Sequence, residues 1–114
     1  MYLLLIVLNK EEYLDDILSC LLELGIEDAV TVDAESMKRS LAAQVPIFAG
    51  LRLDLGRRPF SKVILSTSNN KNTGNEIIRL LKEVDIDLEA PGVSRIYTLK
   101  LESVLGTPET IEEL

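Results

Sequence analysis

The stretch YLLLIVL, from Tyr2 to Leu8, decides the fold of this chain. It is apolar throughout, it is too short for a helix, and Asn9 and a group of charged residues follow it. A run of this kind is typical of a strand that is buried on both faces. Successive side chains of a strand point to opposite faces, so each face of this one is aliphatic. One face carries Leu4, Ile6 and Leu8, and the other carries Leu3, Leu5 and Val7.

A helix is predicted directly after this strand. Apolar residues recur at helical spacing from Tyr13 to Leu24, and acidic residues lie mostly on the other side. Asn9 is expected to cap the helix, with Glu12 at the third helical position as in a capping box. Gly25 is expected to end the helix in the left-handed conformation.

Three more strands and a second helix complete the predicted order. The strands are expected at 29–33, with an extension to residue 37 left open, at 63–68 and at 95–104. A second amphipathic helix begins at Thr73, with Glu76 again at capping-box spacing, and continues to Val84. Thr107 and Pro108 predict a short acidic helix over 107–114.

The order β-α-β-β-α-β is that of the ferredoxin-like fold. We therefore predict one α+β domain over 1–114, in which two helices cover one face of a four-stranded antiparallel sheet. Strands one and three are expected at its centre. Strands two and three are joined by a long loop over 36–60, where Pro46, Gly50, Gly56 and Pro59 interrupt regular structure.

The face of this sheet opposite the helices is expected to need a partner. Leaving one apolar set of the first strand in water forgoes about 1.5–3 kcal/mol for each side chain that could be fully buried. An exposed apolar patch of that kind usually marks an interface. We expect a second subunit to cover this face. The alternative is that the insertion between strands two and three folds back over it within one chain.

The insertion is basic, whereas the rest of the chain is acidic. From Ser36 to Lys62 there are six basic residues and one acidic residue, so the segment carries 6 − 1 = +5. The whole chain carries −7, which leaves −12 on the other residues. A basic insertion in an acidic body indicates a site for an anionic ligand or partner. The negative net charge argues against nucleic acid as a partner of the whole domain.

Two basic pairs, Lys38–Arg39 and Arg57–Arg58, lie near the two ends of the loop. Guanidinium groups suit phosphate or carboxylate in a bidentate manner, and the pairs are expected to converge at the base of the loop. The alternative is that they pair with acids of the same or a neighbouring subunit. Before the last strand, Gly92 is expected to bring backbone N–H groups close to an anion, with Arg95 nearby.

The middle of the loop, VPIFAGL, is apolar and does not fit a simple solvated loop. Its large side chains are expected to dock on a subunit or to close over a ligand. These interaction candidates are Val45, Ile47, Phe48 and Leu51.

Catalytic and metal-binding patterns are not found in the sequence. The chain has no histidine and a single cysteine, which excludes zinc, copper and haem sites of the usual composition and any Ser-His-Asp arrangement. Cys20 lies among apolar helix positions and is interpreted as a core thiol. The acidic pairs Asp15–Asp16 and Asp85–Asp87 are interpreted as solvated, with hard-cation binding as the alternative. We predict that the protein is not an enzyme.

The sequence also indicates the cellular compartment of the protein. No apolar run reaches the roughly 18 residues of a membrane span, and the apolar start has no basic region before it or cleavage site after it. One cysteine excludes an internal disulfide and suits a reducing cytoplasm. We expect a cytoplasmic protein without a transmembrane segment.

In order and spacing, the chain resembles the PII (nitrogen regulatory protein P-II) family and its PII-like relatives. The resemblance extends over most of 2–106 and is carried by LLLIVLN, by the LLELGI–AVTV junction and by PGVSRIYTLKLESVLG. It implies a compact homotrimer whose sheets line the centre. It also implies that the loop over 36–60 is the target-binding T-loop, and that adenine nucleotides bind between subunits, at the base of that loop and at the loop over 89–95.

The resemblance is that of a divergent member, because the two loops read ESMKRS and EAPGVSR where the family has glycine-rich sequences. We therefore expect a non-enzymatic regulator that senses a small anion, such as an adenine nucleotide or bicarbonate. The ligand would order the loop and change its affinity for a target protein, and membrane proteins are among the candidate targets. The alternative is a ligand-independent interaction module that uses the apolar centre of the loop.

Overall fold

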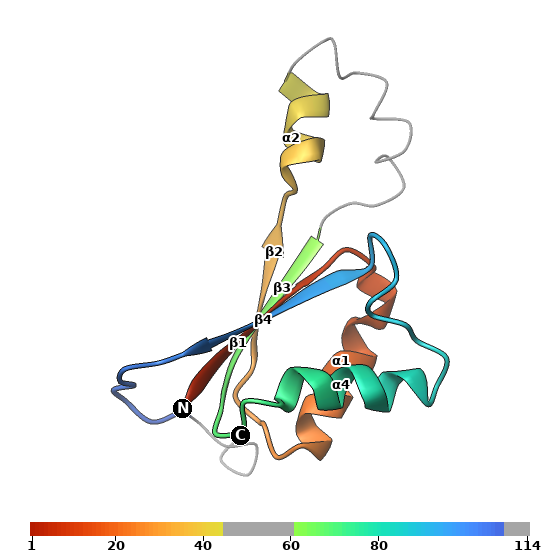
Figure 1. The fold of residues 1–114 in the computed structure, drawn as a ribbon. Helices are drawn as coiled ribbons and strands as arrows, with labels where there is room; N and C mark the ends of the chain where they lie inside the picture. The colour runs from red at the N-terminus through yellow and green to blue at the C-terminus, as the bar shows by residue number, and fades with distance from the viewer. Residues whose placement is uncertain (45–60, 109–114) are drawn as a thin grey trace.

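The computed structural model describes residues 1–44 and 61–108, and Figure 1 shows their arrangement. A 3-10 turn, η1, precedes the first helix. The strands are β1 (Tyr2–Leu8), β2 (Val30–Ala34), β3 (Ser61–Ser68) and β4 (Ser94–Lys100). The helical segments are η1 (Glu11–Tyr13), α1 (Leu14–Glu23), α2 (Met37–Gln44) and α4 (Thr73–Lys82).

The four strands form one antiparallel sheet in the order β2-β3-β1-β4. The predicted central strands are therefore central, and Leu5 of β1 lies opposite both Leu65 and Tyr97. Helices α1 and α4 lie together on one side of the sheet (Figure 1). This α+β architecture confirms the predicted fold class and is compatible with a ferredoxin-like fold.

The core lies between the sheet and these two helices. Leu4, Ile6 and Leu8 of β1 are at most 2% exposed, and the buried side chains of both helices pack against them. The buried hydrophobic residues of the two helices are Ile17, Cys20, Leu21, Ile77 and Leu81. α4 approaches the sheet closely at Gly74, where a Cβ atom would lie 3.0 Å from Cγ2 of Ile96. The apolar set Leu4, Ile6 and Leu8 is thus the set that the helices cover.

The prediction that Gly25 ends the first helix is confirmed. Gly25 has a φ of 82°, and its N–H donates to the carbonyl of Leu22 at 3.0 Å. The N–H of Ile26 donates to the carbonyl of Leu21 at 2.9 Å, which completes a Schellman motif. The same pair of bonds follows α4, but there the left-handed residue is Asp85, with a φ of 62°.

Both predicted capping boxes are wrong, because other partners take the capping side chains. α1 has no side-chain hydrogen bond at its N-cap, and the Asn9 carboxamide accepts a hydrogen bond from Ser61 instead. Thr73 lies inside α4 and is buried. Its hydroxyl lies 2.6 Å from that of Ser68 and donates to the carbonyl of Asn70 at 2.9 Å.

The connection between β2 and β3 is not simply a loop. β2 ends at Ala34, one residue beyond the predicted limit, so the extension to residue 37 does not occur, and α2 begins at Met37. Ser36 caps this helix: its hydroxyl accepts from the N–H of Arg39 at 3.2 Å, and its carbonyl accepts from the N–H of Ser40 at 3.0 Å. Strong helix formers follow in SLAAQ. α2 stands beyond the ends of β2 and β3, away from the helical layer (Figure 1).

Two strands have limits that differ from the predicted ones, and only the start of the predicted tail helix is described. β3 begins two residues earlier than expected, and β4 ends at Lys100 rather than at residue 104. Thr107 and Pro108 are not helical, and the rest of the helix predicted over 107–114 lies outside the described residues. None of the helices in 1–44 and 61–108 has the length and apolar character needed to cross a bilayer.

Candidate functional site

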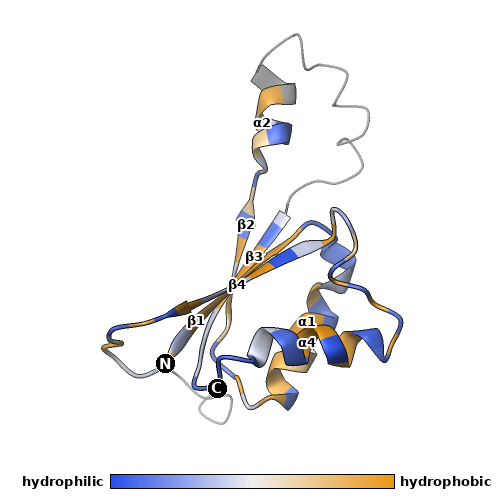
Figure 2. Ribbon diagram, in the orientation of Figure 1, coloured by the Kyte–Doolittle hydropathy of each residue, from blue (hydrophilic) through white to orange (hydrophobic). Residues whose placement is uncertain are grey.

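The sheet face opposite α1 and α4, called here the open face, carries large apolar residues from all four strands. Figure 2 shows hydrophobic segments on the strands. The register places one apolar row across the middle of the sheet and, towards the end from which α2 rises, a second row of three valines and one arginine. The middle row consists of Val30, Leu65, Leu5 and Tyr97, and the second row of Val32, Val63, Val7 and Arg95. Leu3 and Leu99 lie on the same face and continue the apolar surface from the middle row towards the end of the sheet away from α2.

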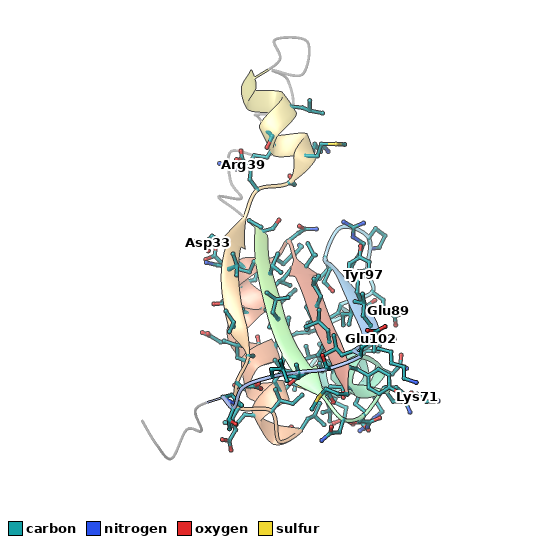
Figure 3. All side chains as sticks on the ribbon, turned by 90° about the vertical axis from the view of Figure 1, so that its left-hand side faces the viewer. Asp33, Arg39, Lys71, Glu89, Tyr97 and Glu102 are labelled. Atoms are coloured by element: carbon teal, nitrogen blue, oxygen red, sulfur yellow. The ribbon has the colours of Figure 1, made fainter. Side chains whose placement is uncertain are left out.

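Several of these side chains are exposed to solvent to an unusual degree for large apolar groups. Val30 is 57% exposed, Val32 46%, Tyr97 42% and Leu99 49%. α2 does not lie over them in either view (Figures 1 and 3). A contiguous apolar surface on a sheet usually marks an interface. The open face is therefore the first part of the candidate site.

The second part is the base of the connection over 35–60, called here the β2–β3 arm. Lys62, the second residue of β3, forms an ion pair with Asp33 of β2 and a second one with Oε1 of Glu11 at 3.6 Å. The Lys62 side chain is 19% exposed, and its hydrogen bond to Asp33 raises the pKa of its ammonium group. It therefore carries its positive charge throughout the neutral range. The first residue of β3, Ser61, donates to Oδ1 of Asn9 at 2.7 Å.

Arg39 stands on α2, above Asp33 in Figure 3. Its Nε lies 3.9 Å from Oε1 of Glu35, one helical turn earlier. Arg39 thus has an acidic neighbour in its own chain, and Lys62 has two. Lys38, in contrast, is exposed on the first turn of α2. Arg57 and Arg58, and the interaction candidates Val45, Ile47, Phe48 and Leu51, lie outside the described residues.

The loop before β4 is the third part. Gly92 has a φ of 77°, which only glycine adopts without strain, and it is exposed. The loop is closed by a hydrogen bond from the N–H of Val93 to the carbonyl of Ala90 at 3.1 Å. Arg95 follows on β4, with its guanidinium carbon 5.9 Å from the centroid of the Tyr97 ring, a cation–π distance. Arg95 belongs to the open face.

The base of the arm and the loop before β4 meet at one end of the sheet. Leu8, at the end of β1, lies opposite Lys62 on β3 and opposite Ser94 on β4. The separation between Lys62 and Ser94 is therefore two strand spacings, roughly 10 Å. The predicted convergence of Lys38–Arg39 with Arg57–Arg58 at the base of the loop depends on two residues that lie outside the described residues. Arg95 and Lys62, however, belong to opposite faces of the sheet.

Elsewhere the described residues offer little chemistry. They contain no group of three or more His, Cys, Asp and Glu side chains placed to hold a metal ion. Asp87 accepts a hydrogen bond from the N–H of Glu89 at 3.0 Å and so has a role in a turn. Cys20 is 4% exposed, and its burial raises the pKa of the thiol. The thiol therefore stays protonated at neutral pH and is a weak nucleophile.

Sequence reasoning missed the ties at the base of the arm, although a signal was present. Asp33 ends one predicted strand and Lys62 precedes the next, so opposite charges flank the insertion on either side. The roles of Asn9 and Ser61 carried no comparable signal, because their contact spans 52 positions in the chain.

Comparison of the sequence with models of known protein families gives no match, and comparison with curated protein sequences gives none either.

Proposed function

We propose that this chain is a PII-like regulatory protein that works as a homotrimer in the cytoplasm and catalyses no reaction. It would sense a small anion, an adenine nucleotide or bicarbonate, at the base of the β2–β3 arm and in a cleft between subunits. The arm would then contact a target protein. The observation that carries the proposal is that the base of the arm and the loop before β4 meet at one end of the sheet, at the last residue of β1.

The open face supports the oligomer. Four large side chains on it are 42–57% exposed in the single chain, and each would contribute roughly half of its full burial energy on being covered. An obligate interface resembles a domain core cut in half, which is the character of this face. A closed cyclic trimer would place three such faces around one axis.

Charge supports an anionic ligand. The body of the protein is acidic, and Lys38 on α2 and Arg95 at the start of β4 are exposed cations of the segments that lie at this end of the sheet. A guanidinium group recognises phosphate or carboxylate through two parallel hydrogen bonds. Arg57 and Arg58 are further candidates on the ground of sequence alone.

The test is thermal unfolding of the purified protein in the presence of ATP, ADP, AMP or bicarbonate. A ligand at 100 times its dissociation constant adds about 2.7 kcal/mol of stability. For a domain of this size that corresponds to a rise in Tm of roughly 10 °C. We expect one of these anions to give such a rise, and we expect Lys38→Ala/Arg95→Ala to reduce it.

The matched control is Arg79→Ala. Arg79 is also an exposed arginine, but it lies on α4 and pairs with Glu83 at 3.3 Å, far from the base of the arm. This variant should keep the full ligand-induced rise. If no anion shifts the Tm of the wild type, and Arg57→Ala/Arg58→Ala behaves like the wild type, the sensing function is wrong.

A further inference from the structure

Asn9 contacts both of the segments proposed to bind ligand. It is the first residue after β1, at the sheet end where the arm and the loop before β4 meet. Its side-chain Oδ1 accepts a hydrogen bond from the hydroxyl of Ser61 at 2.7 Å. Its backbone N–H donates to the carbonyl of Val93 at 2.9 Å. Asn9 is thus bonded through its side chain to the foot of the arm, which we define as Ser61 and Lys62, the first two residues of β3. Through its backbone it is bonded to the loop before β4.

The surroundings of Asn9 hold this arrangement in place. Val93 is 6% exposed and packs in the core, so its carbonyl is fixed by a buried side chain. Lys62, next to Ser61, pairs with Asp33 and with Glu11, which lies two residues after Asn9. The foot of the arm is therefore tied twice to the short segment between β1 and α1. A displacement of β3 at Ser61 has a direct path to Val93.

We infer that Asn9 is a positioning residue that couples the foot of the β2–β3 arm to the loop before β4. Through it, ordering of one segment favours the ordered state of the other. The role in ligand sensing rests on the proposed function, but the coupling itself is a property of the ligand-free protein. A test without ligand therefore separates failure of the coupling from failure of the sensing function.

The first test is amide hydrogen exchange on the ligand-free full chain, with peptides covering 61–66 and 86–94. Ser61→Ala removes the hydroxyl, and Ser61→Thr retains it. Loss of one hydrogen bond corresponds to roughly a five- to tenfold change in an opening equilibrium. We expect Ser61→Ala to speed exchange five- to tenfold in 86–94 as well as locally, and Ser61→Thr to restore the wild-type rate. A purely local effect overturns the inference.

The second test reads the coupling in the opposite direction. Gly92→Ala strains the loop through its φ of 77° and meets no atom within 4 Å, so its effect comes from the backbone alone. We expect it to speed exchange in 61–66 in the wild type. In an Asn9→Ala background the same substitution should add nothing there, because the connection is already broken. If the effects of the two substitutions multiply, the segments are independent and the inference fails.

Global stability is measured for every variant by guanidinium unfolding, and exchange is compared only for amides that open without complete unfolding. Where Gly92→Ala does not fold, Gly92→Asn replaces it, because asparagine tolerates the left-handed region better.

Discussion

Replacing Leu99 by lysine should dissociate the proposed trimer while leaving the subunit folded. Leu99 lies on the edge strand β4, on the open face, and is 49% exposed in the single chain. Complete burial of such a side chain contributes about 1.5–3 kcal/mol, so covering its exposed half contributes about 0.7–1.5 kcal/mol. The four most exposed residues of the face together would contribute about 3–6 kcal/mol per subunit on association.

Lysine at this position removes that gain and adds the cost of burying a charge, which is several kcal/mol when no partner is present. The expected loss is about 3 kcal/mol or more per contact, roughly a hundredfold in the dissociation constant. The subunit itself should tolerate the change, because half of the side chain is already in water.

The assay is size-exclusion chromatography with light scattering over a range of concentrations. The wild type should have three times the subunit mass of 12.7 kDa, about 38 kDa, and Leu99→Lys should approach 12.7 kDa. The matched control is Leu22→Lys, since Leu22 is 51% exposed but lies on α1, in the helical layer. It should keep the mass of the wild type.

Three results would refute this reasoning. The wild type could be a monomer at all concentrations, Leu99→Lys could keep the trimer mass, or Leu22→Lys could dissociate it equally. The first result would leave the alternative that the insertion covers the open face within one chain.

Three further outcomes follow from the described residues. Asp85→Gly should raise the free energy of unfolding by about 0.5–1 kcal/mol in urea titration. The φ of 62° suits glycine, and a carboxylate at the C-terminus of a helix interacts unfavourably with the helix dipole. Asp85→Asn removes only the charge and should raise the free energy of unfolding by less. Ser36→Ala should cost α2 about 1 kcal/mol and speed exchange at the Arg39 amide roughly fivefold, whereas Ser36→Asp should not; unchanged exchange would refute the cap. Because burial raises the pKa of the Cys20 thiol, the unfolded chain loses this proton at a lower pH than the folded chain does. The contribution of Cys20 to the free energy of unfolding is therefore constant below about pH 8.5, and stability falls as pH rises above that value. Cys20→Ala should flatten that decline in chemical denaturation at pH 8–10, and an identical decline in the variant would contradict it.

Most of the fold could be predicted because its signals are local or periodic. The continuous apolar run at Tyr2–Leu8 defined a central strand, and Gly25 marked the end of α1 because few other residues adopt a positive φ. α2 could have been found from the same kind of signal, since Ser36 precedes a run of helix formers. The glycines and prolines further along the insertion hide this signal, because they favour a loop over the whole segment.

The predicted caps failed because other partners took the capping side chains, a residue of a distant strand for Asn9 and residues just before the helix for Thr73. Asn9 and Thr73 both have the spacing of a capping box, yet the hydroxyls of Ser61 and Ser68 bond to them instead. Sequence spacing describes only the backbone groups within one turn. It carries no information on which side chain of another strand arrives at hydrogen-bond distance.

The sequence by itself determined that β1 has two apolar faces, that the fold is of the α+β class, and that positive charge gathers between β2 and β3. These follow from side-chain alternation and composition, which need no knowledge of neighbours in space. Only the tertiary structure decided which face the helices cover, that Lys62 joins Asp33 and Glu11, and that Asn9 lies between the two loops. Those facts depend on the strand register, and one residue of slip in β3 would carry Lys62 to the other face of the sheet.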